Sequence, residues 1–324
     1  MYNQVEAILS QYDVEINGVT KGRGSYICNT NKGMKLLLPF CGSKEKGEFL
    51  RQYLAELDEN GFTVEQILAN KEEAAVTEDE VTGERFLLKD YIGGKELDTA
   101  CKEEMIEAVR LLARYHKVSR ELEVAIPDKM KENEKLVVES CKRHCREFIK
   151  VKNYIRNRKK KNEFEQVYMR HYASMLETAE ASIACLEKQE LNALYVGICH
   201  GEYNQHNVVR TDDGWHMVHF ENYAYSWRIV DLANFMRKMM EKHNWDVALG
   251  DALVEAYRKE YELKQEELQK LYGILLFPEK FWKVTNHYMN SRKTWISERD
   301  IEKLKKVIAQ EEERLNFVEN LFHI

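Results

Sequence analysis

A histidine, an acid and an amide lie close together in the middle of the chain. His200, Gly201 and Glu202 are consecutive, and Asn207 follows after four intervening residues. The carboxylate of Glu202 can receive a hydroxyl proton, and the side-chain amide oxygen of Asn207 can bind magnesium. His200 is expected to orient the backbone of the loop. This spacing predicts a loop of the kind that carries phosphoryl transfer.

A hairpin is expected directly after this loop. Asp213 and Gly214 form a typical tight turn between one strand at 207–210 and a second at 215–220. In phosphoryl-transfer sites of this type the second strand ends on an aspartate that holds magnesium. His219 stands at that place.

The side chains in this pattern are a poor set of magnesium ligands. Asn207, His219 and Glu221 are the predicted metal ligands, and Glu202 is in the position of the base. Magnesium prefers oxygen ligands, whereas imidazole suits zinc, copper, iron or nickel. The extra methylene of Glu202 moves its carboxylate by about 1 Å, which can cost roughly a hundredfold in rate. A rebuilt transition-metal site is the alternative, and four histidines lie in the segment: His200, His206, His216 and His219.

Phosphoryl transfer also needs a lysine that contacts the nucleotide from a strand near the N-terminus. The expected strand is 34–39, and its inward position is Leu38. Lys35 lies three residues earlier, so strand alternation turns it to the opposite face. Lys35 is the candidate cofactor-binding lysine only under a shifted register. With Leu38 at the inward position, the pairing of a lysine with Glu45 or Glu48 of the following helix is lost.

Length and composition indicate a soluble globular protein. The 324 residues are 44% hydrophobic and carry a net charge of −6, which does not favour a nucleic-acid binder. No apolar stretch predicts a membrane span, and the N-terminus does not resemble a secretory signal. Seven scattered cysteines indicate reduced thiols in a cytoplasmic protein.

The order of predicted elements changes along the chain. Short strands separated by glycine turns are expected between 14 and 91, interrupted by one amphipathic helix at 44–60. A glycine hinge follows at 92–95, and the remaining sequence is nearly all helical. This order is that of a kinase-like small lobe, so we predict a small, mostly β lobe at 1–94 and a helical lobe at 95–324.

One basic run in the helical part allows two interpretations. Residues 150–161 are rich in Lys and Arg. Such a run is either a solvated helix face or a patch that binds a polyanion.

Several motifs together resemble a known family. The segments C-H-G-E-Y-N-Q-H-N-V, V-H-F-E and R-I-V-D-L-A-N-F-M-R-K resemble the aminoglycoside phosphotransferase and choline kinase group. They are more similar to the spore coat protein S (CotS) family of kinase-like proteins. Supporting segments are 40–43, 91–98, 112–116, 277–283, 286–290 and 293–295. The resemblance implies an α+β, bilobal protein-kinase-like fold and a role in sporulation or spore coat assembly.

The chain departs from the family pattern at Leu38, Glu202 and His219. These departures predict a pseudokinase that acts as a scaffold or interaction protein, with no cofactor expected. Its partners would be other spore coat or sporulation proteins, and not membrane or nucleic acid. It would be cytoplasmic, in the mother cell, or in the spore coat. The alternative is an active small-molecule phosphotransferase that uses ATP and Mg²⁺, with Glu202 as base and Asn207 with Glu221 as metal ligands. A third possibility is a regulator that binds metal or nucleotide without turnover.

Overall fold

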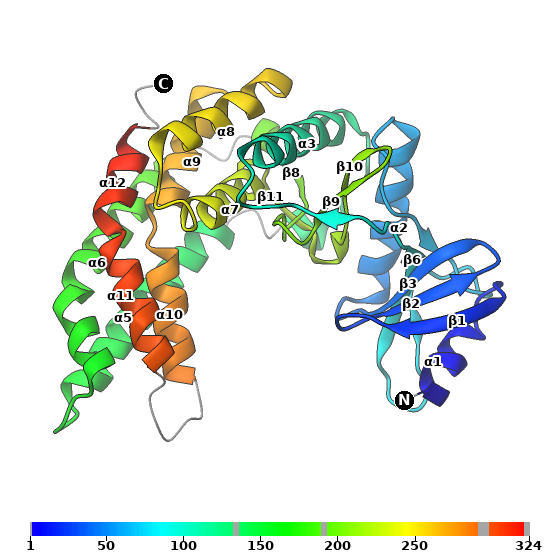
Figure 1. The fold of residues 1–324 in the computed structure, drawn as a ribbon, viewed down its shortest axis with the longest axis horizontal. Coiled ribbons are helices and arrows are strands. Elements are labelled where there is room, and N and C mark those ends of the chain that lie inside the picture. The colour runs from blue at the N-terminus through cyan, green and yellow to red at the C-terminus, as the bar shows by residue number, and fades with distance from the viewer. Residues whose placement is uncertain (1, 132–135, 189–192, 291–297, 321–324) are drawn as a thin grey trace. The chain divides into compact units, whose positions relative to one another are not determined.

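The computed structural model describes residues 2–131, 136–188, 193–290 and 298–320 (Figure 1). The described chain is a mixed α+β protein that divides into two compact units. The first contains Met1–Ala125 and His200–Tyr223, and the second contains Ile126–Cys199 and Ala224–Ile324. The segment with the predicted catalytic loop therefore belongs to the same compact unit as the N-terminal strands. The lobe boundary predicted at residue 94 stays a prediction.

An antiparallel sheet forms the centre of the first unit. Its order is β1-β2-β3-β6-β4, and β5 also pairs with β6. Short turns join β1 to β2 and β2 to β3, which makes these neighbours antiparallel. The short strands expected between residues 14 and 91 are present, and β4 and β5 have two residues each. The strands are β1 (Ile16–Lys21), β2 (Tyr26–Thr30), β3 (Gly33–Pro39), β4 (Ile67–Leu68), β5 (Thr77–Glu78) and β6 (Arg85–Asp90).

Two helices accompany this sheet. Helix α1 (Tyr2–Leu9) buries Val5 and Leu9 in an apolar cluster with residues of β2, β3 and β6. Helix α2 (Lys44–Glu59) contacts β4, and Ser43 caps it by accepting a hydrogen bond from the Lys46 amide. The amphipathic helix predicted at 44–60 is confirmed. Its buried side chains include those expected to face inward: Phe49, Leu50, Tyr53, Leu54 and Leu57.

The predicted hairpin after the catalytic loop is also present. Strands β9 (Val208–Thr211) and β10 (Gly214–Met217) are antiparallel, with Gly214 opposite Thr211. Strand β7 (Lys95–Glu96) pairs with the other edge of β9. A short 3₁₀ helix, η3 (Phe220–Asn222), follows the hairpin. Helix α3 (Lys102–Glu121) contacts β10 and completes the unit.

The second unit is helical except for one strand pair. Strands β8 (Val196–Cys199) and β11 (Ala224–Trp227) are antiparallel. A capping box at Asn162 starts α6, and α6 packs against α5, α9 and α11. Residues 293–295 of the family resemblance lie outside the described chain. The helices are α4 (Asp128–Lys131), α5 (Leu136–Arg156), α6 (Glu163–Glu187), η2 (Ala193–Tyr195), α7 (Ile229–Met240), α8 (Val247–Glu260), α9 (Gln265–Leu276), α10 (Glu279–Asn290), α11 (Glu298–Ala309) and α12 (Glu311–Asn320).

Within residues 2–131, 136–188, 193–290 and 298–320, no helix is long and apolar enough to cross a bilayer.

The cysteines are free thiols and differ in exposure. Burial raises the pKa of Cys28 and Cys145 to about 11 and that of Cys141 to about 12, while Cys41 is exposed. Since the thiolate is the reactive form, we expect Cys41 to give the fastest phase of modification by a thiol reagent such as DTNB. Cys41→Ser should remove that phase. A fast phase that survives this substitution would contradict the expectation.

Candidate functional site

His200 connects the predicted catalytic loop to the hairpin behind it. The ring is fully buried, and its Nε2 donates to the Val218 carbonyl oxygen at 2.9 Å. Its Nδ1 accepts from the Glu202 backbone amide at 3.3 Å. One ring nitrogen donates and the other accepts, as in a neutral imidazole. His200 therefore holds the loop backbone in place, as its position in the sequence predicts.

Gly201 allows the loop to pass close to η3. Its φ is +80°, and a Cβ atom there would lie 2.0 Å from the carbonyl oxygen of Asn222. Side chains other than glycine are strained at this φ, and real Cβ atoms do not approach backbone oxygens so closely. The chain fold at the site therefore depends on glycine at this position.

We expect Gly201→Ala to lower the free energy of unfolding by at least about 2 kcal/mol, because backbone strain and steric overlap add. Gly33 is a matched control, with φ of +86° and no atom within 4 Å of a Cβ. Gly33→Ala should cost only the backbone strain, about 1 kcal/mol. Urea denaturation of both variants measures the difference. Equal losses would show that the approach to Asn222 is not limiting.

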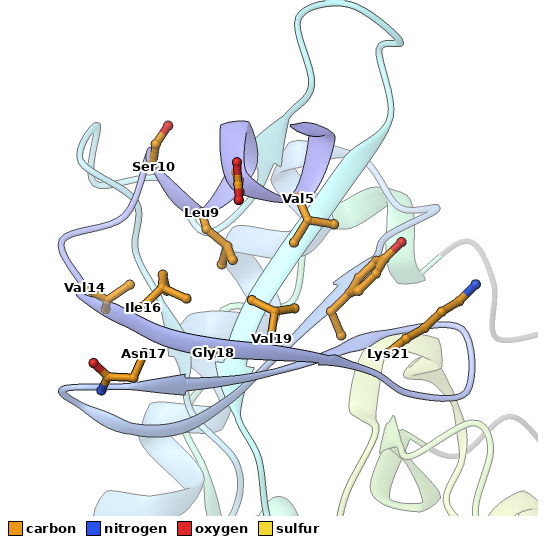
Figure 2. Close-up of a pocket in the computed structure, with 11 residues that line it drawn as sticks. Val5, Leu9, Ser10, Val14, Ile16, Asn17, Gly18, Val19 and Lys21 are labelled. Carbon is orange, nitrogen blue, oxygen red and sulfur yellow. The ribbon is translucent and has the colours of Figure 1, made fainter. Parts of the chain in front are cut away.

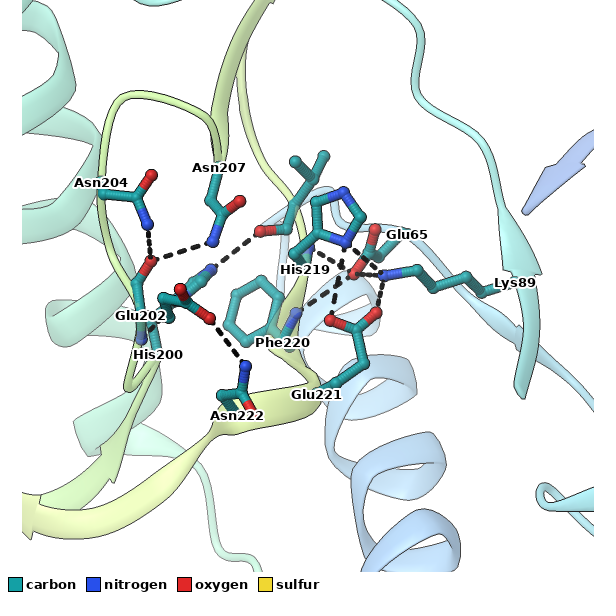
Figure 3. Close-up of polar contacts among 11 residues, drawn as sticks. Glu65, Lys89, His200, Glu202, Asn204, Asn207, His219, Phe220, Glu221 and Asn222 are labelled. Atoms are coloured by element: carbon teal, nitrogen blue, oxygen red, sulfur yellow. Dashed lines mark hydrogen bonds and ion pairs between the residues drawn. The ribbon is translucent and has the colours of Figure 1, made fainter. Parts of the chain in front are cut away.

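Glu202 and Asn207 are brought together by the loop (Figure 3). The Glu202 carbonyl oxygen accepts from the side-chain amides of Asn204 and Asn207, each at 2.9 Å. The Asn207 carbonyl oxygen accepts from the Val218 amide at 3.0 Å. The Glu202 carboxylate has a different partner and accepts a hydrogen bond from the Asn222 side-chain amide at 2.7 Å. The loop is thus held together by side-chain hydrogen bonds to its backbone, and the Asn207 amide nitrogen is already in use.

A buried lysine dominates the region around His219 and Glu221. The side chain of Lys89 is 1% exposed, and its Nζ donates to Glu65 Oε1 at 2.6 Å and also to Glu221 Oε1. Lys89 Nζ is 3.4 Å from His219 Nδ1, and that nitrogen is 3.6 Å from Glu221 Oε2. Glu65 also accepts from the backbone amides of His219 and Phe220 at 2.7 and 3.3 Å. Figure 3 shows these side chains converging on the lysine nitrogen.

The charges in this cluster are strongly coupled. Burial lowers the pKa of Lys89, but Glu65 and Glu221 outweigh burial and leave this pKa above its ordinary value. Burial raises the pKa of Glu221, yet Lys89 and His219 bring it well below its ordinary value. For Glu65 burial is the largest effect, and its pKa is raised. At neutral pH the Lys89 ammonium is therefore shared between two carboxyl groups, and Glu221 is the more firmly ionised of them.

The raised pKa of Lys89 predicts a stability change in alkaline solution. The stabilisation from the ammonium is complete below the unfolded-state pKa of about 10.4 and is lost as the pH rises through the folded-state pKa. The difference in unfolding free energy between the wild type and Lys89→Met should therefore shrink above about pH 10.4. Guanidinium titrations of both proteins at increasing pH measure it. A difference that stays constant into strong alkali would contradict the assigned charge state.

Strand register explains why Lys89, and not Lys35, enters this cluster. Lys89 is opposite Leu36 and Leu87 is opposite Leu38, so these side chains share one face of the sheet. Lys35 lies on the other face, where its Nζ is 2.5 Å from Asp90 Oδ1. The structure therefore separates Lys35 from Glu221, and its predicted role in cofactor binding stays a prediction.

Neither Glu65 nor Lys89 is among the site residues predicted from the sequence. The available signal was a lysine in the otherwise apolar middle of R-F-L-L-K-D, at a position with the inward alternation. A lysine there is almost never fully buried unless it is paired. Its partner Glu65 comes from the segment before β4, which no local motif connects to the hairpin.

The predicted metal ligands are not all free to bind magnesium. The structure places His219 and Glu221 together, but Glu221 is bound to Lys89. In the described part of the chain, no group of three or more His, Cys, Asp or Glu side chains could hold a metal ion. Magnesium needs several oxygen ligands in near-octahedral geometry, and an ammonium beside its acid opposes it. The metal roles of Asn207, His219 and Glu221 stay predictions.

Comparisons with known proteins agree with the loop and the fold. Residues 19–274 match the phosphotransferase enzyme family, known as APH. The chain belongs to this family.

One sequence relative and two solved structures give further detail. The chain is 24% identical to spore coat protein S of Bacillus subtilis strain 168 over 332 residues, covering 98% of this chain and 93% of that protein. Its fold is similar to an aminoglycoside phosphotransferase from Alicyclobacillus acidocaldarius, with a TM-score of 0.81, 18% identity, and 98% and 95% of the two chains covered. A spectinomycin phosphotransferase in complex with ADP and spectinomycin gives a TM-score of 0.67, 11% identity and 98% coverage of both chains. The predicted α+β, kinase-like fold and the resemblance to spore coat protein S are confirmed.

Proposed function

We propose that this chain is a kinase-fold protein of spore coat assembly that has lost metal-dependent phosphoryl transfer and acts as a scaffold or interaction protein. The observation that carries the proposal is the position of the Lys89 ammonium, bound to both Glu65 and Glu221. Glu221 is the acid that would have to compensate for His219 at the metal site. The Lys89 ammonium is already bound to this carboxylate.

The Lys89 ammonium would repel a magnesium ion bound to Glu221. A magnesium ion on Glu221 lies about 2.1 Å from a carboxylate oxygen, which brings it close to Lys89 Nζ. A charge of +2 about 4 Å from a charge of +1 is repelled by roughly 8 kcal/mol at an effective dielectric constant of 20. This repulsion disfavours a metal on Glu221 unless the lysine leaves its two carboxylates. Leaving them is costly because the side chain is buried among charges.

The other departures from the family pattern support the same proposal. His219 offers ring nitrogens to a hard cation that prefers oxygen. Glu202 directs its carboxylate to Asn222. Each change alone weakens a metal-bound triphosphate site. Combined with Lys89, they remove the charges that such a site uses.

An active phosphotransferase with an atypical site is the second candidate. Membership of the phosphotransferase enzyme family and the retained Asn207 favour it. In this scheme Glu202 is the base, with Asn207 and Glu221 as ligands of the metal that accompanies ATP. It requires Lys89 to release Glu221.

Thermal denaturation with ATP, with and without Mg²⁺ or Mn²⁺, separates the candidates. Ligand at about 100 times its Kd adds about 2.7 kcal/mol to the unfolding free energy. We expect no metal-dependent increase and no transfer of radiolabelled phosphate. A metal-dependent increase with turnover would favour the active enzyme. An increase without metal and without turnover would favour a nucleotide-binding regulator.

The proposed role in the coat rests on similarity to spore coat protein S over nearly the whole chain. Its partners would be other coat or sporulation proteins, first in the mother-cell cytoplasm and then in the coat. A fluorescent fusion expressed in sporulating Bacillus subtilis tests this role. We expect fluorescence to gather at the forespore surface. Fluorescence that stays evenly spread through the mother cell until its lysis would contradict the role.

A further inference from the structure

Strand β1 forms an open edge of the first unit's sheet. Its neighbour in the sheet is β2, and within the described chain no second strand pairs with it. The register is irregular between Ile16 and Gly18 but regular from Gly18 to Lys21. Most of the strand is exposed. Its outer backbone groups are therefore available to pair with another extended chain.

A cavity lies beside this edge, between β1 and helix α1 (Figure 2). Its volume is about 520 Å³, within the range of pockets that take specific ligands. Val5 and Leu9 of the helix line it from one side, and Ile16 and Val19 of the strand from the other. Figure 2 shows these apolar side chains facing one another across the space.

The cavity continues the apolar core of the unit. Val5 and Leu9 belong to the buried cluster beneath α1, and Val14, Val19 and Tyr26 pack against that cluster. Added strands lie about 4.8 Å from their neighbours, and alternate side chains point to one face. A strand placed beside β1 would therefore put every second side chain on the α1 side of the sheet. Those side chains would extend the core.

Two charged side chains line the cavity, Glu6 of α1 and Lys21 of β1. Lys21 lines the cavity at the end of β1, is exposed, and forms no ion pair with the described residues. An acidic residue next to Lys21 complements this charge. Gly18 has no side chain and lines the space with its backbone, which suits a ligand with its own backbone donors and acceptors.

We propose that β1 and this cavity form a docking site for an extended peptide segment of a partner protein. The segment has apolar residues at alternate positions and an acidic residue at the end nearest Lys21. Main-chain hydrogen bonds to β1 supply affinity, and the side chains in the cavity supply specificity. This inference does not depend on whether the metal site is active.

A synthetic peptide tests the docking site on the whole protein. The probe is acetyl-Glu-Ile-Thr-Ile-Thr-Val-amide with a fluorescent label, together with the reversed sequence for the opposite strand direction. We expect one of them to bind in an anisotropy titration. N-methylation of the backbone nitrogens that face β1 should weaken binding by at least about tenfold, because it removes the pairing donors and keeps the side chains.

Two neighbouring substitutions map the site. Val19→Lys puts a charge into the cavity and should weaken binding by about tenfold or more. Thr20→Lys is the matched control, because alternation places Thr20 on the other face of the strand. It should change affinity by less than about threefold. Thermal denaturation checks that both variants fold, and slowed amide exchange at Gly18–Lys21 of the wild type with peptide gives a second readout.

Three outcomes would overturn the proposal. One is the absence of binding by both peptides, and another is equal binding by the N-methylated and unmodified forms. The third is a dimer in light scattering that Val19→Lys dissociates, since a second copy would then cover this edge.

Discussion

Lys89→Met should lower the free energy of unfolding by about 3–5 kcal/mol, the largest stability loss expected from a single change at the site. Lys89 lies between Glu65 and Glu221, and its side chain is almost completely buried. Removing the ammonium leaves two acids in a poorly solvated region with no cation between them. Breaking a buried charge pair from one side costs about this amount.

Two comparisons make this result specific. Lys35 also pairs with an acid in the same sheet, but the Asp90 side chain is 35% exposed, so Lys35→Met should cost about 1 kcal/mol or less. Adding Glu65→Gln to Lys89→Met should recover part of the loss, because one of the unpaired charges is removed. Urea denaturation measures all three. Equal losses for Lys89→Met and Lys35→Met would contradict a central role for the buried cluster.

Restoring metal-dependent nucleotide binding should require removal of Lys89 as well as repair of the two departures near it. Glu202→Asp with His219→Asp supplies the expected acids, but Lys89 still binds Glu221. For this double variant we expect ATP to cause no metal-dependent change in the free energy of unfolding. With Lys89→Met and Glu65→Gln added, Mg²⁺ and ATP at about 100 times their Kd should raise the unfolding free energy by about 2.7 kcal/mol.

Calorimetry of the two variants with Mg²⁺ and ATP is the direct measurement. The double variant, which retains Lys89 and Glu65, is the matched control for the quadruple variant, in which both are replaced. Metal-dependent nucleotide binding by the Glu202→Asp, His219→Asp double variant would show that Lys89 is readily displaced from Glu221. In that case the proposed loss of activity in the wild type would depend on residues 202 and 219 only.

Much of the fold could be predicted because local signals agreed with one another. The apolar spacing of α2 and its Ser43 cap define that helix without tertiary information. The Asp213-Gly214 turn defines the hairpin of β9 and β10 in the same way. The short strand pair β8 and β11 was not predicted, since its partners are separated by the whole catalytic-loop segment.

The site was predicted only in part, for the same physical reason. The spacing of His200, Glu202 and Asn207 is local, and the structure joins these residues by hydrogen bonds. The contact of Lys89 with Glu221 spans 132 residues, and that of Glu65 with the backbone amide of His219 spans 154. Such pairings arise from strand register and burial, which a local motif does not contain.

The central claim is that the Lys89 ammonium is already bound to Glu221, the acid that a metal ion would need. A crystal structure of the wild-type protein grown with Mn²⁺ and ATP tests it most directly, because anomalous scattering locates manganese. We predict that Lys89 Nζ remains bound to Glu65 and Glu221, with no anomalous peak at Asn207 or Glu221. A manganese ion bound to Asn207 and Glu221, with Lys89 displaced, would contradict the claim.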